Sequence, residues 1–194
     1  MKNQILDEAF SLFSEKGTLF SMQELAKAVG MKAPSLYNYY ASKNDLLHDL
    51  IAQEIDRYYM FFNRLFENES ETSEQLIKDV FYSVIDYYSD QLKAKFRRRL
   101  GMIDGNHRQY IKEILAKNDE VIILKLRNVF EDCINKGVIP DHNVDQTLFH
   151  YYFVLQGIIS NSIYYEKGDK HYANAIDSTW ESFWAGLSCF GNDK

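Results

Sequence analysis

Residues 20–47 read FSMQELAKAVGMKAPSLYNYYASKNDLL, and two helix starts lie on either side of a short turn. Ser21 and Glu24 have the spacing of a capping box, in which each side chain binds the backbone amide of the other residue. The helix that follows meets Gly30, which tolerates the positive φ at which many helices end. Pro34 suits the first turn of a second helix, where its missing amide is not needed. This order of elements predicts a helix-turn-helix.

The second helix of this motif has two unlike faces. At about 100° per residue, Leu36 and Tyr40 fall together and predict a face toward a core. Ser35 and Asn38 fall on the other side, which carries hydroxyls, an amide and small side chains but almost no charge. Such groups reach base edges and phosphates in a major groove. Ser42 then predicts the cap of a third helix.

The pattern continues on both sides of the motif, over residues 5–51. Its apolar positions, its glycines and its Ser42–Lys43 pair resemble the DNA-binding domain of the TetR/AcrR family of bacterial regulators. Tyr40 stands where that family more often has Phe. The matching residues are Ile5, Ala9, Phe13, Gly17, Leu25, Ala26, Val29, Gly30, Leu36, Tyr37, Tyr40, Lys43, Leu46 and Leu47.

The resemblance implies a homodimeric one-component transcription regulator, a repressor whose head binds a palindromic operator until a small-molecule effector enters the body. Groove and phosphate contacts are expected from the second helix, phosphate contacts from Ser21 and Lys43, and a base contact from Gln23. The predicted DNA-binding residues are Ser21, Gln23, Lys32, Ala33, Pro34, Ser35, Tyr37, Asn38, Tyr39 and Lys43.

The composition of the 194-residue chain favours an all-α fold. Two prolines and nine glycines leave room for long helices, and the hydrophobic content of 46% is ample for a packed core. We expect about nine helices in two domains, with a three-helix head at 1–50 and a helical body at 51–194. The expected body helices are 43–66, 72–92, 107–136 (with an interruption near 118–119), 143–167 and 170–190, with a linker at 67–72 and a break at 104–105.

The charge balance opposes non-specific attraction to nucleic acid. The net charge is −6, and residues 1–50 hold five Lys, no Arg and six acidic residues, a net charge near −1. A specific site needs only a local patch, which Lys27, Lys32 and Lys43 can supply. The alternative that this balance supports is an all-α ligand-binding or interaction protein whose head does not bind DNA.

The cysteines and the first residues indicate a compartment. Cys133 and Cys189 are the only cysteines and predict free thiols in a reducing environment. Residues 1–10 predict an acidic helix rather than a signal peptide, and no apolar run approaches the ~20 residues of a membrane span. We expect a cytoplasmic protein.

Most of the aromatic residues lie in the body, where 23 of the 29 Phe, Tyr and Trp occur. Aromatics at helical spacing predict a core, but buried tyrosine hydroxyls need partners and can line a ligand cavity. The run at 97–99, three arginines, is either a solvated face or a source of one guanidinium for an anionic effector. The candidate pocket residues are Phe62, Phe81, Tyr88, Arg98, Tyr110, Phe130, Phe153 and Gln156.

The last two expected helices carry more apolar surface than one packing face needs. They predict either burial within one chain or a homodimer, and the resemblance implies a four-helix interface. A C2 dimer with two heads reads a palindrome. The candidate interface residues are Val154, Leu155, Ile158, Ile159, Ser162, Ala173, Ile176, Trp180, Phe183 and Trp184.

Enzyme chemistry finds no support in the sequence. The five histidines are scattered without metal-ligand spacing, and no phosphate-binding glycine loop, nucleophile elbow or CxxC motif occurs. We therefore predict no catalytic residue, no metal and no cofactor, with DNA, a small molecule and a second copy of the chain as partners and no membrane.

Overall fold

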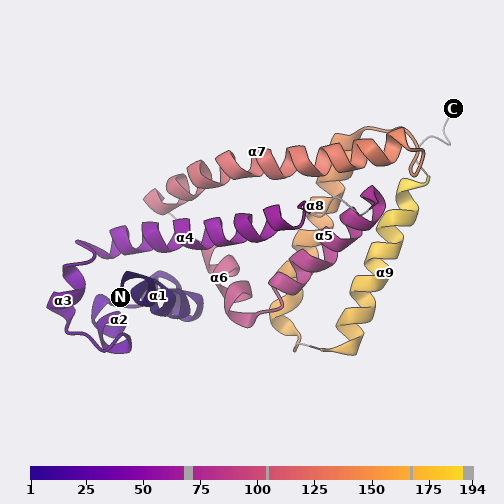
Figure 1. Cartoon of the computed structure of the whole chain (residues 1–194). Helices are drawn as coiled ribbons and strands as arrows, with labels where there is room; N and C mark the ends of the chain where they lie inside the picture. Colours follow the sequence, from indigo (N-terminus) through magenta and orange to yellow (C-terminus); the bar gives the residue numbers. More distant parts are fainter. Residues whose placement is uncertain (68–71, 104, 167, 190–194) are drawn as a thin grey trace. The chain divides into compact units, whose positions relative to one another are not determined.

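The computed structural model describes residues 1–67, 72–103, 105–166 and 168–189. Over these ranges the chain forms nine α-helices and two short 3-10 helices, without a strand (Figure 1). The prediction of an all-α fold with about nine helices is confirmed. No helix within these ranges is both long enough and apolar enough to cross a membrane.

The helices belong to two compact units. The first comprises Met1–Tyr59 and Leu92–Lys117, and the second comprises Met60–Gln91 and Asn118–Lys194. The first unit therefore includes a segment, Leu92–Lys117, that the proposed division at residue 50 leaves in the body. Helices α4 and α7 each contribute residues to both units.

The head of the first unit is built from short helices around an apolar centre. Gly17, at φ 59°, ends the first helix, and Gly30, at φ 70°, makes the turn of the motif, so both positions use a backbone that other residues avoid. Ile5, Phe13 and Leu25 are fully buried, which explains their spacing in the sequence. The elements are α1 (Lys2–Lys16), η1 (Gly17–Leu19), α2 (Met22–Ala28) and α3 (Ala33–Tyr37).

Three further helices contribute to the first unit: α4 (Lys43–Arg64), α6 (Gln91–Gly101) and α7 (Gly105–Asn135). Helix α6 packs against α1, because the ring of Phe96 lies 5.2 Å from that of Phe10 and 5.1 Å from that of Phe13. In α7, the Tyr110 ring stacks at 4.1 Å on the His48 ring of α4, and its hydroxyl donates to the His48 carbonyl.

The second unit contains α5 (Ser73–Tyr87), α8 (Val144–Asn161), η2 (Ser162–Tyr164) and α9 (Lys170–Leu187). Its core is aromatic. Tyr151 of α8 is buried among Phe81, Phe130 and Phe183, at centroid distances of 5.6 to 6.0 Å. The Tyr151 hydroxyl donates to the Ile77 carbonyl at 3.0 Å, which provides the partner that a buried tyrosine needs.

Several predicted boundaries in the body differ from the structure, and α6 (Gln91–Gly101) lies where no separate helix was expected. Helix α5 ends at Tyr87 rather than 92, where the Ser89 amide closes a turn on the Asp86 carbonyl. Helix α7 runs without the expected interruption at 118–119. Helix α8 ends at Asn161, whose side chain donates to the Gly157 carbonyl in competition with the helix ladder. The predicted ends at 104 and 190, and most of the 67–72 linker, lie outside the described residues.

Candidate nucleic-acid interface

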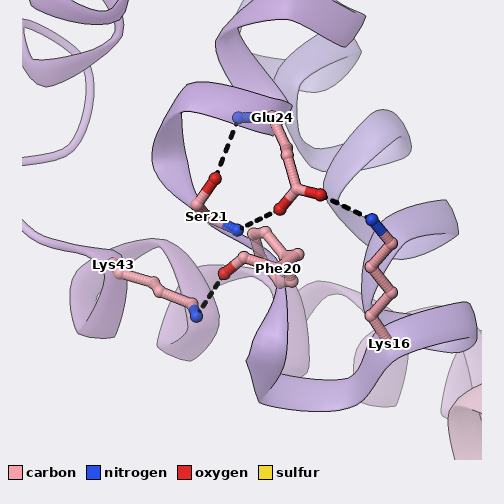
Figure 2. Close-up of polar contacts among 5 residues, drawn as sticks. All are labelled: Lys16, Phe20, Ser21, Glu24 and Lys43. Atoms are coloured by element: carbon pink, nitrogen blue, oxygen red, sulfur yellow. Dashed lines mark hydrogen bonds and ion pairs between the residues drawn. The ribbon is translucent and has the colours of Figure 1, made fainter.

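The predicted capping box begins α2 (Figure 2). The Ser21 hydroxyl accepts a hydrogen bond from the Glu24 amide at 3.1 Å, and the Ser21 amide donates to the Glu24 carboxylate at 2.7 Å. Two backbone amides that the first turn leaves without partners are satisfied in this way. The prediction of this cap is confirmed, and the entry into the helix-turn-helix is fixed by local chemistry.

A cation from α1 joins the same cap. The second carboxylate oxygen of Glu24 pairs with the Lys16 ammonium at 2.5 Å, as Figure 2 shows. The hydrogen bond from Lys16, together with those from Ser21, lowers the pKa of Glu24 to about 2. The carboxylate therefore remains charged throughout the neutral range and neutralises Lys16, so this lysine adds little to a positive surface.

Lys43, at the start of α4, points toward the connection between α1 and α2 (Figure 2). Its ammonium donates to the backbone carbonyls of Thr18 and Phe20 at 2.5 Å each and lies 4.7 Å from the centroid of the Phe20 ring. Partial burial lowers its pKa. Lys43 thus joins the N-terminus of α4 to the segment that precedes α2.

This role was not visible in the sequence. The acceptor carbonyls lie 25 and 23 residues before Lys43 along the chain, and backbone carbonyls leave no residue-type signal. The phosphate contact stays a prediction, and in the unbound chain the ammonium already has two acceptors. Lys43 therefore positions the helix-turn-helix before any nucleic acid is present.

Helix α3 presents the predicted outer face. Leu36 and Tyr40 are buried beneath it, whereas Tyr37 and Tyr39 are 50% and 43% exposed and Asn38 is exposed between them. Around these residues the other predicted contacts are distributed between exposed positions (Ser21, Gln23, Lys32 and Pro34) and partly exposed ones (Ala33, Ser35 and Lys43). The head thus places all ten candidates at or near one unit's surface, and none is buried.

The start of α4 and its first turns complete the head. The Ser42 hydroxyl accepts from the Asp45 amide at 3.1 Å, which confirms the predicted cap, and donates to the Asp45 carboxylate at 2.8 Å. Lys2 of α1 pairs with Asp49 at 2.8 Å and lies over the Tyr40 ring. The two Lys2 contacts join α1 to α4 and to the segment that follows α3.

A family model described as bacterial regulatory proteins of the tetR family matches residues 5–50, the segment that carries this geometry. The head segment, residues 5–50, is thus similar to the TetR family of regulators. An uncharacterized HTH-type transcriptional regulator, YvaF of Bacillus subtilis, is 34% identical over 84 residues, which are 43% of this chain. The match spans 44% of that relative, so less than half of its length is compared.

Solved TetR-family structures share the whole fold. A TetR transcription regulator from Haloarcula marismortui superposes with a TM-score of 0.77 at 14% identity and covers 96% of this chain and 97% of its own. FadR from Bacillus subtilis in complex with stearoyl-CoA superposes with a TM-score of 0.75 at 19% identity, covering 96% and 100%. At these identities the likeness concerns the fold alone.

The candidate pocket residues are divided between the two units. Arg98 and Tyr110 belong to the first unit, where Arg98 is exposed and Tyr110 packs on His48. The other six belong to the second unit. Four of these are buried aromatic residues, Gln156 is partly exposed and Phe153 is 65% exposed. The four buried residues are Phe62, Phe81, Tyr88 and Phe130.

The candidate interface residues are mostly inside the second unit. Trp180 packs at 5.2 Å on Phe81, and Phe183 packs at 5.6 Å on Tyr151. Val154, Ile158 and Trp184 are partly exposed, and Ala173 is exposed. The buried members of the set are Leu155, Ile159, Ser162, Ile176, Trp180 and Phe183.

The outward face of α8 carries aromatic residues that the sequence interpretation did not single out for an interface. Phe149, Tyr152 and Phe153 are 64%, 54% and 65% exposed, and the Phe149 and Phe153 rings stack at 6.3 Å. Their spacing of three and four residues was a signal for a shared face. Periodicity could not show which of the two apolar faces of this helix is buried.

Within the described residues, no group of three or more His, Cys, Asp or Glu side chains could hold a metal ion. Cys133 is buried, and desolvation raises the pKa of its thiol to about 11, so it is poorly suited to act as a nucleophile.

Proposed function

We propose that this chain is a homodimeric one-component transcription regulator, a repressor that binds a palindromic operator through its head and leaves it when a small molecule binds the body. The observation that carries the proposal is the head itself. A capped α2 and a Lys43-anchored α4 hold α3 so that Tyr37, Asn38 and Tyr39 are exposed.

The DNA contacts follow from side-chain chemistry. The exposed hydroxyls and amide at the end of α3 and just beyond it would donate and accept hydrogen bonds at base edges and phosphates, and the exposed Gln23 near the start of α2 would contact a base. Two copies of the head on a C2 dimer would contact half-sites roughly 34–36 Å apart, or a multiple of that spacing.

The second copy has a suitable surface on α8. Exposed aromatic residues at 149, 152 and 153 would leave water in a dimer, together with the partly exposed Val154 and Ile158. Aromatic residues are enriched in the buried centres of such interfaces. We therefore move the centre of the proposed interface from the residues buried in one chain to this outward face of α8.

This dimer is tested by sedimentation of the wild type and of the double variant Phe149→Ser and Phe153→Ser. The variant should sediment as a folded monomer, because both side chains are exposed in the single chain and contribute little to its stability. The matched control is His171→Ser at an exposed position of α9. A variant that dimerises as tightly as the wild type would place the interface elsewhere.

The proposed effector site is the aromatic core of the second unit, around Phe62, Phe81, Tyr88 and Phe130. The likeness to FadR, whose structure holds stearoyl-CoA, supports the proposal that this fold can accommodate a small molecule. Rings in contact would have to separate around a ligand, which would displace the ends of the helices that carry them. A rise in the unfolding temperature on titration with candidate molecules would identify the effector.

A signal from the body can reach the head through α6. This helix follows α5 in the chain after only a short turn, and it packs on α1 through Phe96. Lys95 pairs with the Glu15 carboxylate at 2.7 Å, and Arg99 donates to the Glu15 carbonyl at 2.8 Å. A shift of α6 would therefore displace α1 and the helices packed on it.

The decisive experiment measures binding of the purified full chain to the DNA that flanks its own gene, by fluorescence anisotropy at several salt concentrations. A repressor should bind one segment in preference to random DNA of equal length, with an affinity that falls as salt rises. Equal binding to both DNAs, or none to either, would favour the alternative of a ligand-binding or interaction protein whose head does not bind DNA.

A further inference from the structure

The head of this chain contains no arginine. The first arginine in the sequence is Arg57, so no guanidinium lies in the helix-turn-helix or in the first turns of α4. Arginine or lysine makes the commonest specific contact in the major groove, a pair of hydrogen bonds to guanine O6 and N7, and the planar fork of arginine suits this bidentate geometry better than the lysine ammonium does. A protein that reads its site with α3 must therefore do so mainly by other contacts.

The exposed side of α3 and of the two residues that follow it, Asn38 and Tyr39, offers an amide, apolar groups and phenols. Pro34, Tyr37 and Asn38 lie three and four residues apart and share the exposed side, opposite the buried Leu36. The side-chain amide of Asn38 makes no hydrogen bond within the described part of the chain, so both its donor and its acceptor are available. Asparagine pairs with adenine N6 and N7, and apolar side chains such as Ala33 contact the thymine methyl group.

The lysines of the head divide into two groups. Three are engaged: Lys2 with Asp49, Lys16 with Glu24, and Lys43 with backbone carbonyls. Lys27 and Lys32 are exposed and form no ion pair within the described residues. A lysine ammonium is a compact point charge on a flexible stem, which suits a phosphate better than a planar bidentate base contact.

We propose that α3 reads A·T base pairs, with adenine opposite Asn38 and thymine methyl groups against Ala33 and Pro34, while Lys27 and Lys32 contact phosphates only. This inference rests on the proposed function, because it names the class of operator that the head selects. The near-neutral head gives little non-specific attraction, so these few contacts carry most of the discrimination.

The test begins with selection of binding sites by the full-length protein from duplexes with a random central segment. The expected result is a palindrome whose half-site centre consists of A·T pairs. In Asn38→Ala, the preference at one A·T pair in each half-site should fall by ~5- to 150-fold, the range for one bidentate base contact. In Lys32→Ala, affinity should fall about equally for all sequences and the selected motif should not change.

A chemical probe in the DNA tests the methyl contacts independently of protein folding. Deoxyuridine in place of thymine removes only the methyl group, and each contacted position should lose ~4-fold in affinity, the value of one buried methylene. The same replacement at flanking positions is the control and should have no effect. The helix content of each protein variant, measured by circular dichroism, should equal that of the wild type because both side chains are exposed.

The outcomes separate the two proposals. Failure to enrich any sequence overturns the proposed function, and this inference with it. The selected palindrome could instead contain essential G·C pairs, and Lys32→Ala or Asn38→Ala could remove the requirement for them. That result overturns the A·T assignment and leaves the DNA-binding function standing. An unchanged motif and unchanged preference in Asn38→Ala removes Asn38 from base recognition, and full affinity for deoxyuridine sites removes the methyl contacts.

Discussion

Replacement of Lys43 by methionine tests whether the head is held together before it meets DNA. The substitution keeps an unbranched apolar side chain of similar length and deletes the ammonium that lies over the Phe20 ring and donates to the Thr18 and Phe20 carbonyls. The Thr18 bond is exposed, so water can replace it, whereas the Phe20 bond is partly buried. One charged hydrogen bond of this kind contributes ~1.5–3 kcal/mol.

The cation over the Phe20 ring adds ~0.5–1 kcal/mol at a partly exposed site. Solvent offsets part of both contributions, and we expect the variant to lose about 2 kcal/mol of the free energy that protects α2 from local opening. Hydrogen exchange of the α2 amides measures this quantity directly. The matched control is Lys27→Met, an exposed lysine of α2 without an ion pair in the described residues, which should change it by less than ~0.5 kcal/mol.

Protection of the α2 amides in Lys43→Met at the wild-type level would refute the positioning role. A second readout separates this role from a phosphate contact. A lysine that neutralises one phosphate changes the slope of log affinity against log salt by about 1 per contact, whereas loss of positioning lowers affinity without changing the slope.

Three further predictions concern single sites. In Glu24→Gln, the head should lose stability at neutral pH. The Lys16 hydrogen bond holds the pKa of Glu24 at about 2. The stability that the Glu24 carboxylate adds should therefore be complete above pH 4.5, its ordinary pKa, and should decline as the pH falls toward 2. Acid titrations followed by circular dichroism should show this decline in the wild type and not in the variant. Gly17→Ala should lower the free energy of unfolding by ~1–3 kcal/mol in urea, because φ at this position is 59° and the added methyl group would lie 3.3 Å from an α6 side chain. A variant as stable as the wild type would contradict the assigned backbone strain. The exposed Cys189 should react with a thiol reagent at pH 8. The buried Cys133, whose pKa is raised to about 11, should react only after the protein unfolds. Two thiols that react equally fast in the folded protein would show that Cys133 is accessible.

Local chemistry was readable along the chain because it involves neighbours in sequence. The capping box of Ser21 and Glu24 spans three residues, and the stops at Gly17 and Gly30 depend on the conformation of single residues. Helical periodicity predicted that Leu36 and Tyr40 share a buried side, and both are buried, although α3 ends at Tyr37 and Tyr40 lies beyond it. These features are satisfied within one or two turns, so they leave a pattern of residue types.

The body shows where periodicity is insufficient. Helix α8 carries apolar residues on two sides, and its packing against other helices, α5 and α9 among them, leaves Leu155 and Ile159 buried while Phe149 and Phe153 remain at the surface. The end of α8 was also mispredicted, because the Asn161 side chain bonds to the Gly157 carbonyl there and periodicity does not register such a bond.

By itself, the sequence determined an all-α chain with an N-terminal helix-turn-helix, because caps, turns and amphipathic spacing act over a few residues. Tertiary structure decided which cations remain available. It directs Lys43 onto carbonyls that lie 23 and 25 residues earlier and joins Arg99 to the Glu15 carbonyl across 84 residues. Such contacts depend on where packing brings distant backbone groups, and a backbone carbonyl has no residue type by which a sequence could announce it.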